Sequence, residues 1–256
     1  MAYFCRFEAD GIKHHGELRG EEVWGLSAAP WAGGKPTSQQ YPLSQVRLLA
    51  PCEPSKIVCL GRNYREHAAE LGHEVPREPL LFLKAPSAII GPEDSIVYPP
   101  QSQRVDYEGE LAVIIGRRCR RLASADAPLG YIFGFTCLND VTARDLQKAD
   151  VQFTRAKSFD TFCPLGPVIA TGVDPNKLVV ETYVNRERRQ RASVREIIFP
   201  LDAIIRFIAA VMTLAPGDVI ATGTPAGVGP LAVGDVVEVV IEGIGRLRNP
   251  VASIKQ

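Results

Sequence analysis

A succession of short apolar runs, each closed by glycine or proline, sets the narrowest limit on how this chain folds. The runs have the length and β-branched content of strands, and few helical patterns lie between them. A doubly wound parallel sheet needs a helix after nearly every strand, so the pattern argues against it. We predict a mostly β fold of the α+β class, in which a mixed sheet is rolled or folded into a barrel or sandwich. The predicted strands are KIVCLG, LLFLK, ELAVIIG, YIFGFTCL, PLGPVIA, LVVETYV, DVIATG and DVVEVVIEG.

Two segments carry clear helical patterns. NDVTARDLQ predicts a helix that starts near Asn139, and LDAIIRFIAAVMTL predicts a longer one that ends before Pro216 and Gly217. A short third helix is expected in YREHAAELG, with Gly72 as its C-terminal cap. In the longer helix the apolar residues recur at helical spacing: Leu201, Ile204, Ile205, Ile208 and Met212.

The chain divides into a small β-rich N-terminal module, residues 1–52, and a main domain, residues 53–256. Strand-like pieces at 3–8, 13–18 and 22–26 come first, and a stretch at 30–45 rich in Pro, Gly, Ser and Gln predicts turns. A chain of 256 residues with 46% apolar residues has material for one main core and one small satellite domain.

The charges of the chain balance, since Lys plus Arg and Asp plus Glu each total 29. The zero net charge gives no overall electrostatic attraction to nucleic acid or to an anionic membrane. We therefore expect the partners to be a small molecule and another copy of the chain. No apolar run reaches the roughly 20 residues of a membrane span, and the start MAYFCRFEAD lacks the pattern of a secretory signal, so a cytoplasmic protein is expected. Six cysteines without a C-x-x-C pair predict buried free thiols rather than disulfides or a zinc site.

Three acidic residues, Asp106, Glu108 and Glu110, stand at alternate positions just before the apolar run LAVII. A strand sends alternate side chains to one face, so the three carboxylates repel each other unless a cation lies among them. Oxygen ligands without nearby histidine or cysteine favour Mg²⁺ or Mn²⁺ over zinc or copper. The alternative is a solvated acidic strand end, because exposure is the default for charged residues.

A second group of polar residues follows in NDVTARDLQ. Asp140, Arg144 and Gln147 lie at i, i+4 and i+7 of the predicted helix, so one face would present a carboxylate, a cation and an amide. That grouping suits a substrate carboxylate beside a metal. The alternatives are that Asp140 only caps the helix, or that Asp140 and Arg144 form a modest surface ion pair.

His67 and Glu70 are three residues apart on the short predicted helix, where a carboxylate can orient an imidazole that activates water. The polar, Pro-containing segment after them suggests that residues 64–78 form a mobile lid. Lys157, just before an apolar strand, is a candidate for stabilising an enolate or donating a proton. Exposed pairs and surface lysines are common, so each feature also has an ordinary structural explanation. The glycines of TGTPAGVGPLAVGD permit a close backbone approach, but the loop lacks the pattern of a phosphate-binding loop.

These motifs, taken in order, resemble the fumarylacetoacetate hydrolase family. The resemblance covers about residues 53–256, and the N-terminal module is similar to the small domain of some bacterial members. It implies a mixed β-sandwich roll, usually a homodimer, with one divalent metal, which we expect to be Mg²⁺ or else Mn²⁺. The matching motifs are GRNYREHAAEL, PLLFLKAPSAIIGP, VDYEGELAVIIGRRCR, NDVTARDLQ, AKSFDTFCPLGP, PGDVIATGTPAGVGP and VGDVVEVVIEGIG. The resemblance assigns the metal ligands to Glu108, Glu110 and Asp140, a lid dyad to His67 and Glu70, the active-site lysine to Lys157, substrate contacts to Arg144, Gln147 and Thr224, and support of the ligands to Asp106.

The similarity is to the acylpyruvase and oxaloacetate decarboxylase branch of that family. The expected reaction is Mg²⁺-dependent hydrolysis of the carbon–carbon bond of an acylpyruvate-type 2,4-dioxo acid, giving pyruvate and a carboxylic acid. His67 backed by Glu70 would deprotonate water, and Lys157 would stabilise or protonate the carbon left behind. Oxaloacetate decarboxylation, oxaloacetate keto–enol tautomerisation and 2-hydroxyhepta-2,4-diene-1,7-dioate-type isomerisation stay open as alternatives, because all share one enolate. A noncatalytic metal-binding roll is a further alternative, but it predicts the loss of a site residue, and none is lost.

Overall fold

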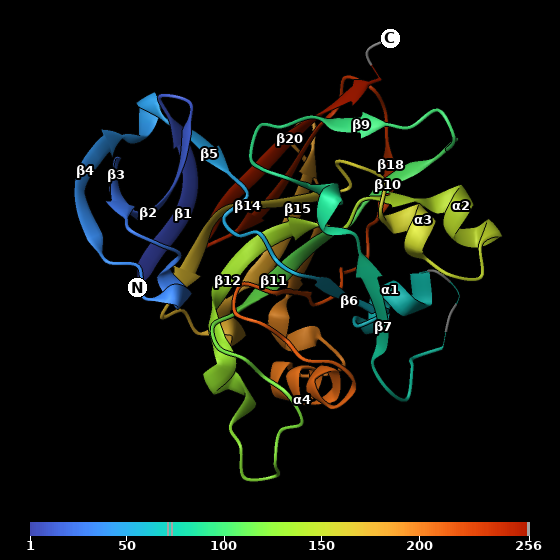
Figure 1. Cartoon of the computed structure of the whole chain (residues 1–256). Coiled ribbons are helices and arrows are strands. Elements are labelled where there is room, and N and C mark those ends of the chain that lie inside the picture. The colour runs from blue at the N-terminus through green and yellow to red at the C-terminus, as the bar shows by residue number, and fades with distance from the viewer. Residues whose placement is uncertain (71, 73, 255–256) are drawn as a thin grey trace.

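The computed structural model describes residues 1–70, 72 and 74–254, and its centre is a large mixed sheet (Figure 1). This sheet has 12 strands within the described residues. Most neighbouring strands are antiparallel and two pairs are parallel, so the predicted mixed, mostly β fold is confirmed. From edge to edge the strands are β4 (Pro36–Pro42), β3 (Glu22–Leu26), β2 (Ile12–Arg19), β1 (Ala2–Ala9), β14 (Cys163–Thr171), β12 (Ile132–Asn139), β11 (Gly109–Ile115), β17 (Val219–Ala221), β6 (Ile57–Gly61) and β7 (Leu80–Lys84), with β5 (Arg47–Leu49) beside β1 and β8 (Ile89–Ile90) beside β14.

Two smaller sheets pack with the large one. Leu111 and Val113 of β11 share a buried apolar cluster with residues from a five-stranded sheet, Val239 and Ile241 among them. The two sheets therefore face each other across a dry core, as in a sandwich. The five-stranded sheet is β16 (Glu187–Ser193), β15 (Val179–Val184), β19 (Val236–Ile241), β20 (Gly245–Ser253) and β9 (Ile96–Tyr98); the three-stranded sheet is β13 (Thr142–Ala143), β10 (Val105–Tyr107) and β18 (Gly229–Leu231).

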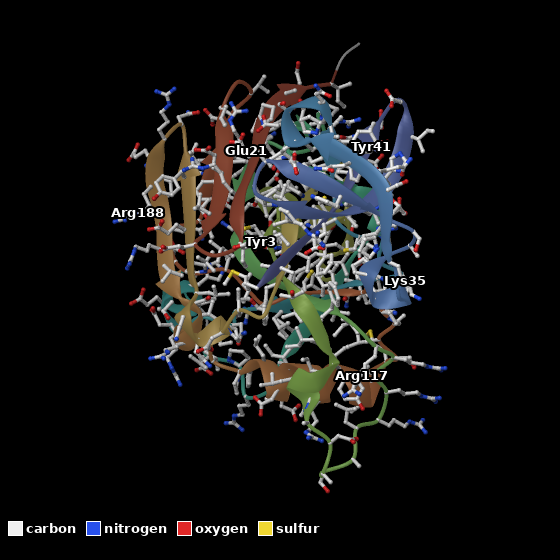
Figure 2. The ribbon with its side chains drawn as sticks, turned by 90° about the vertical axis from the view of Figure 1, so that its left-hand side faces the viewer. Tyr3, Glu21, Lys35, Tyr41, Arg117 and Arg188 are labelled. Carbon is white, nitrogen blue, oxygen red and sulfur yellow. The ribbon has the colours of Figure 1, made fainter. Side chains whose placement is uncertain are left out.

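The N-terminal strands extend the large sheet rather than forming a separate one. β1, β2 and β3 match the predicted strands, and β1 pairs antiparallel with β14, Phe4 opposite Ile169. The prediction of turns at 30–45 is wrong for β4, which pairs with β3 through Trp24 and Gln40. β4 is mostly exposed and polar, so backbone pairing rather than an apolar pattern holds it. Figure 2, turned by 90°, shows this layer facing the viewer, with Tyr41 of β4 labelled in it.

Helix α4 (Leu201–Val211) closes the core below β11 and β12 in Figure 1. Four of the five residues of its predicted apolar stripe are buried on one face of the helix, whereas Met212 follows the helix and is only partly buried against the main cluster. Each such aliphatic side chain contributes roughly 1.5–3 kcal/mol on burial. The buried residues are Leu201, Ile204, Ile205, Ile208 and Ala209.

The other helices are short and lie near one end of the large sheet: α1 (Arg65–Glu70), α2 (Arg144–Ala149) and α3 (Thr154–Lys157). The helix predicted in NDVTARDLQ does not start near Asn139. Strand β12 runs to Asn139, and α2 begins only at Arg144. Thr142 pairs with Asp106 in the three-stranded sheet, and the β-branched Val141 and Thr142 favour that extended path. Asp140 is therefore neither on the helix nor its cap.

Single-turn 3-10 helices connect several strands, at Pro30–Ala32, Leu43–Gln45, Pro86–Ala88, Pro128–Tyr131, Pro175–Lys177 and Val194–Glu196. Of the helices in the described ranges, none has the length and apolar content to cross a bilayer. All six cysteines are buried and free, as predicted.

Candidate active site

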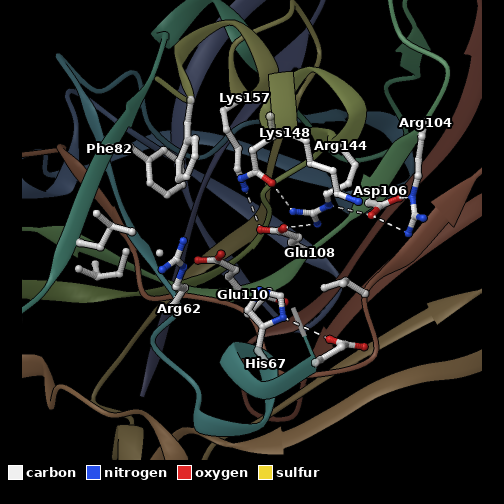
Figure 3. A pocket seen from close by; sticks show the side chains of 18 residues that line it. Arg62, His67, Phe82, Arg104, Asp106, Glu108, Glu110, Arg144, Lys148 and Lys157 are labelled. Atoms are coloured by element: carbon white, nitrogen blue, oxygen red, sulfur yellow. Dashed lines mark hydrogen bonds and ion pairs between the residues drawn. The ribbon is translucent and has the colours of Figure 1, made fainter. Parts of the chain in front are cut away.

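A cavity of about 620 Å³, the size of a small-molecule site, opens beside the short helices (Figure 3). Its walls come from the ends of β6 and β7, from the β10–β11 segment, from α1, α2 and α3, and from the loop after β17. Most of the predicted site residues line it: His67, Glu70, Glu108, Glu110, Arg144, Gln147, Lys157 and Thr224, together with Asp106.

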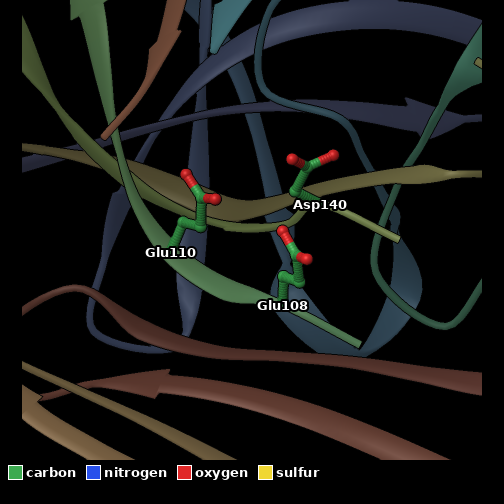
Figure 4. Close-up of side chains that lie close together, drawn as sticks. All are labelled: Glu108, Glu110 and Asp140. Atoms are coloured by element: carbon green, nitrogen blue, oxygen red, sulfur yellow. The ribbon is translucent and has the colours of Figure 1, made fainter. Parts of the chain in front are cut away.

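Two carboxylates that line the cavity, Glu108 and Glu110, lie close to a third, Asp140 (Figure 4). One oxygen from each of Glu108, Glu110 and Asp140 lies within 4.8 Å of the others. Glu108 stands between β10 and β11, and its backbone oxygen accepts a 2.8 Å hydrogen bond from the backbone N–H of Asp140. The three residues are 5%, 1% and 1% exposed, so the alternative of a solvated strand end is excluded.

The backbone between the two glutamates is held from both sides. Gly109 donates its N–H to Gln190 Oε1 at 3.0 Å, and its carbonyl accepts from Thr224 Oγ1 at 2.8 Å. A Cβ on Gly109 would come within 2.0 Å of Thr182 Oγ1, so only glycine fits between the two ligand candidates. Gln190 was not predicted, because nothing in its own hairpin sequence points to residues 81 positions away.

Buried cations neutralise two of the three carboxylates. Lys157 donates to Glu108 Oε2 at 2.8 Å and to Asp140 Oδ2 at 2.6 Å, while Lys84 donates to Asp140 Oδ1 at 2.6 Å. Burial acts to raise the pKa of Glu108, but Lys157 and Arg144 outweigh it and hold that pKa below its usual value. Burial likewise acts to lower the pKa of Lys157, yet Asp140 and Glu108 raise it, so the lysine stays charged.

Glu110 differs from its neighbours because no ion pair to it is found within residues 1–70, 72 and 74–254. Its Oε2 accepts a 2.7 Å bond from the backbone N–H of Gly223. Burial first, and then the charges of Asp140 and Glu108, raise the pKa of Glu110 well above its usual value. A hard divalent cation bound by all three carboxylates would remove this repulsion, so the residues fit such an ion.

Arg144 links the triad to a further buried carboxylate. Its Nε donates to Asp106 at 2.9 Å, its Nη2 to Glu108 at 2.5 Å and its Nη1 to Gln147 at 2.6 Å. Arg104 also donates to Asp106. Arg144 and Gln147 thus lie together as predicted, but Asp140 is not on their helix and bonds to Lys84 and Lys157 instead.

His67 and Glu70 lie together on α1. His67 is 4% exposed, and its Nδ1 lies 3.3 Å from Glu70 Oε2. Both carboxylate oxygens of Glu70 accept from the backbone N–H of Gly227, at 3.0 and 3.2 Å, so the glycine-rich loop contacts the helix. The predicted lid at 64–78 stays a prediction, and its residues Leu71 and His73 lie outside the described ranges.

Two predicted residues have hydroxyl or amide groups already engaged. Thr224 is 2% exposed, donates to Gly109 and accepts from Gln190 Nε2 at 2.8 Å, so its hydroxyl has no second proton for a substrate. Gln147 accepts from Arg144 and keeps its N–H groups for the cavity.

Lys84 is the clearest residue that the sequence interpretation missed. It ends the apolar strand LLFLK with a side chain that is 0% exposed. A lysine is almost never fully buried without a partner, so a lysine closing an apolar strand was a usable signal. Its partner, Asp140, could not be read from the sequence.

Comparisons with known proteins give the following matches. Residues 56–252 match a family model described as fumarylacetoacetate (FAA) hydrolase C-terminal, and residues 4–51 match one described as Rv2993c-like, N-terminal. A Bacillus subtilis protein named oxaloacetate tautomerase YisK is 43% identical over 242 residues, 87% of this chain and 80% of that protein.

Two solved structures share the fold over nearly the whole chain. The 2-hydroxyhepta-2,4-diene-1,7-dioate isomerase from Mycobacterium marinum has a TM-score of 0.91 and 42% identity, covering 100% of both chains. A maleylpyruvate hydrolase from Sphingobium has a TM-score of 0.81 and 33% identity, covering 98% of this chain and 100% of that one. The resemblance expected from the motifs and the predicted fold are both confirmed.

Proposed function

We propose that this chain, which belongs to the fumarylacetoacetate hydrolase family, interconverts the keto and enol forms of a short 2-oxo dicarboxylic acid such as oxaloacetate. The observation that carries the proposal is that a buried imidazole, His67, and a buried ammonium, Lys157, line one cavity with Glu108 and Glu110. These two carboxylates form a close cluster with that of Asp140. Relatives named as a tautomerase and an isomerase support this chemistry more than the expected hydrolysis, which becomes the second candidate.

The reaction needs a base at the carbon next to the 2-oxo group and positive charge at the oxygen. His67 fits the base, because Glu70 holds Nδ1 and leaves Nε2 to take the proton. Lys157 stays charged and places positive charge beside the developing enolate, with one N–H left after its two carboxylate bonds. The enolate oxygen takes a proton from the remaining N–H of Lys157 or from solvent, which completes the enol. The reverse reaction removes that oxygen proton and returns the proton of His67 to carbon.

The carboxylates of Glu108, Glu110 and Asp140 would hold the divalent cation, which we propose is Mg²⁺, with Mn²⁺ as the alternative, since all donors are oxygen. When bound, the ion supplies Lewis-acid polarisation of the 2-oxo oxygen. Arg144 stays between Asp106 and Glu108 and positions the triad, and Gln147 offers N–H groups to the substrate.

The testing experiment follows the enol absorbance of oxaloacetate with Mg²⁺ and with EDTA, corrected for spontaneous exchange. Decarboxylation of oxaloacetate and cleavage of an acylpyruvate are measured in the same preparations. Tautomerisation that Mg²⁺ accelerates and EDTA abolishes supports the proposal. A preparation that binds Mg²⁺ but leaves the exchange rate at its spontaneous value overturns it.

Hydrolysis of an acylpyruvate is the second candidate, favoured by the His67–Glu70 pair and by the structural match to a maleylpyruvate hydrolase. In that reaction His67 would deprotonate a water molecule rather than carbon. If the same preparation cleaves an acylpyruvate faster than it tautomerises oxaloacetate, hydrolysis becomes the first candidate for the function.

Assembly and location are proposals as well. We propose a homodimer from the family resemblance, and light scattering of the purified protein tests its mass. The six buried free thiols favour a reducing compartment such as the cytoplasm.

A further inference from the structure

We infer that Arg62 binds the substrate carboxylate farthest from the 2-oxo group and so selects dicarboxylic over monocarboxylic 2-oxo acids. The inference rests on the proposed function, because it names the substrate class of the same cavity. Arg62 lines that cavity and is partly buried. Arg62 is not among the residues assigned to the metal, to the His67–Glu70 pair or to the substrate contacts.

Most cations of the cavity are already matched by carboxylates of the protein. Arg104 and Arg144 both hold Asp106, and Lys157 holds two ligand candidates, Glu108 and Asp140. Their charge is therefore largely neutralised before a substrate enters.

Arg62 and Lys148 are the exceptions. Within the described ranges neither side chain takes part in a hydrogen bond or an ion pair. Lys148 is exposed, so water and salt screen its attraction for an anion. Arg62 is partly buried, and its planar fork matches a carboxylate with two parallel hydrogen bonds. Arg62 is thus the stronger candidate for an anionic group of the ligand.

The backbone fixes Arg62 at the cavity wall. Its φ of +58° lies in the left-handed region, which side chains other than those of Asn and Asp seldom adopt. The next residue, Asn63, is 0% exposed, donates from Nδ2 to the Thr222 carbonyl at 2.8 Å and accepts from the Phe199 N–H at 2.9 Å. The turn is held by contacts far along the chain, so the backbone of Arg62 is fixed at the cavity wall before the ligand binds.

The position of Arg62 suits an extended, doubly charged ligand. Figure 3 shows it on the side of Phe82 and Glu110, well separated in the view from Arg104 and Arg144. When the 2-oxo end of a dicarboxylate is bound at the triad, its distal carboxylate is still negatively charged and is stabilised by a nearby cation. Arg62 offers that cation on the wall beside the triad.

The test compares two unreactive probes that share a 2-hydroxy acid end: malate, which has a second carboxylate, and lactate, which does not. Their affinities for the Mg²⁺-loaded full chain are measured by titration calorimetry. Arg62→Gly is the main variant, because glycine adopts the left-handed conformation without strain. Arg62→Lys keeps the charge but not the fork, and Lys148→Met removes the other unpaired cation as a matched control.

We expect Arg62→Gly to weaken malate binding by about 10- to 150-fold, the value of a charge-assisted hydrogen-bonded pair, and to leave lactate binding and Mg²⁺ affinity unchanged. The malate affinity of Arg62→Lys should lie between those of Arg62→Gly and the unmodified protein. The malate affinity of Lys148→Met should equal that of the unmodified protein. Equal weakening of malate and lactate, or no weakening of either, overturns the inference. Selective loss of malate in a protein without tautomerase activity would keep Arg62 as the selecting residue and refute only the proposed reaction.

Discussion

Replacing Glu110 by glutamine should stabilise the metal-free protein while abolishing its metal binding. Glu110 is 1% exposed, no cation within the described ranges pairs with it, and burial together with Asp140 and Glu108 raises its pKa. Glutamine has nearly the same shape, and its Oε1 can still accept from the Gly223 N–H. The substitution therefore removes the free-energy cost of burying a carboxyl group that must either be charged or keep its proton, and it changes little else.

The size of the effect follows from that environment. Relieving one buried, poorly satisfied charged group is worth about 1–3 kcal/mol. In a domain of this size each kcal/mol shifts the melting temperature by roughly 2–4 °C, so Glu110→Gln should melt roughly 2–12 °C higher in EDTA. The unmodified protein at a Mg²⁺ concentration about 100 times Kd should gain about 2.7 kcal/mol, and the variant should gain none.

The assay is thermal unfolding of both proteins in EDTA and in Mg²⁺, with Glu108→Gln as the matched control. Glu108 is paired with Lys157 and Arg144, so its removal leaves buried cations unmatched and should cost about 3–5 kcal/mol in EDTA. The two glutamine variants should thus both lose metal binding but shift stability in opposite directions. A Glu110→Gln protein that is less stable in EDTA, or that Mg²⁺ stabilises as much as the unmodified chain, would refute the reasoning.

The same group gives a pH dependence with a defined sign. Between the ordinary value of 4.5 and its raised folded pKa, Glu110 keeps a proton in the folded, metal-free chain that the unfolded chain has released. The free energy of unfolding therefore falls as pH rises through this window. In metal-free buffer, the free energy of unfolding of Glu110→Gln should exceed that of the unmodified protein by little at pH values below that window and by most at pH values above it.

Three further predictions concern other parts of the site and core. Lys84→Met should lower the free energy of unfolding of the metal-free protein by about 3–5 kcal/mol in urea, because Asp140 loses a buried partner; a loss under about 1 kcal/mol would contradict this. His67→Ala should reduce kcat by about 10²–10⁴-fold with Mg²⁺ affinity unchanged, and an unaltered rate would remove His67 from the mechanism. The buried thiols, such as Cys163 with its pKa raised by burial to about 12, should react with a thiol reagent only as fast as the protein unfolds; rapid labelling of the folded chain would argue against their burial.

Features with a local period could be predicted from the sequence. The strands β6, β11, β14 and β19 follow from short apolar runs between turns, and α4 follows from its apolar stripe. Asp106, Glu108 and Glu110 share the cavity because alternate residues of an extended segment face one way. The polar strand β4 was not predicted because backbone hydrogen bonds to β3 hold it in place. Such pairing does not require apolar residues, so the sequence shows no strand pattern there.

The helix expected from Asn139 shows where local reasoning fails. Helical spacing placed Asp140, Arg144 and Gln147 on one face, whereas the chain continues as an extended strand segment to Ala143. The pairing of Thr142 with Asp106 supplies the backbone hydrogen bonds that the first turn of a helix would have made. Sheet contacts outweigh weak helix propensity at such positions.

By itself the sequence determined the strand-rich architecture, the acidic pair at 108 and 110, and the family to which the chain belongs. The family resemblance already grouped Asp140 with that pair, but only the tertiary structure decided that Asp140 reaches it from the end of β12 and not from a helix. The tertiary structure also decided that Lys84 and Lys157 pair with Asp140 and Glu108, whereas Glu110 has no cation partner within the described ranges. The reason is physical: these side chains come from strands and helices far apart in the chain, and hydrogen-bonded pairing of the backbone, not spacing in the sequence, brings their charges within a few ångströms.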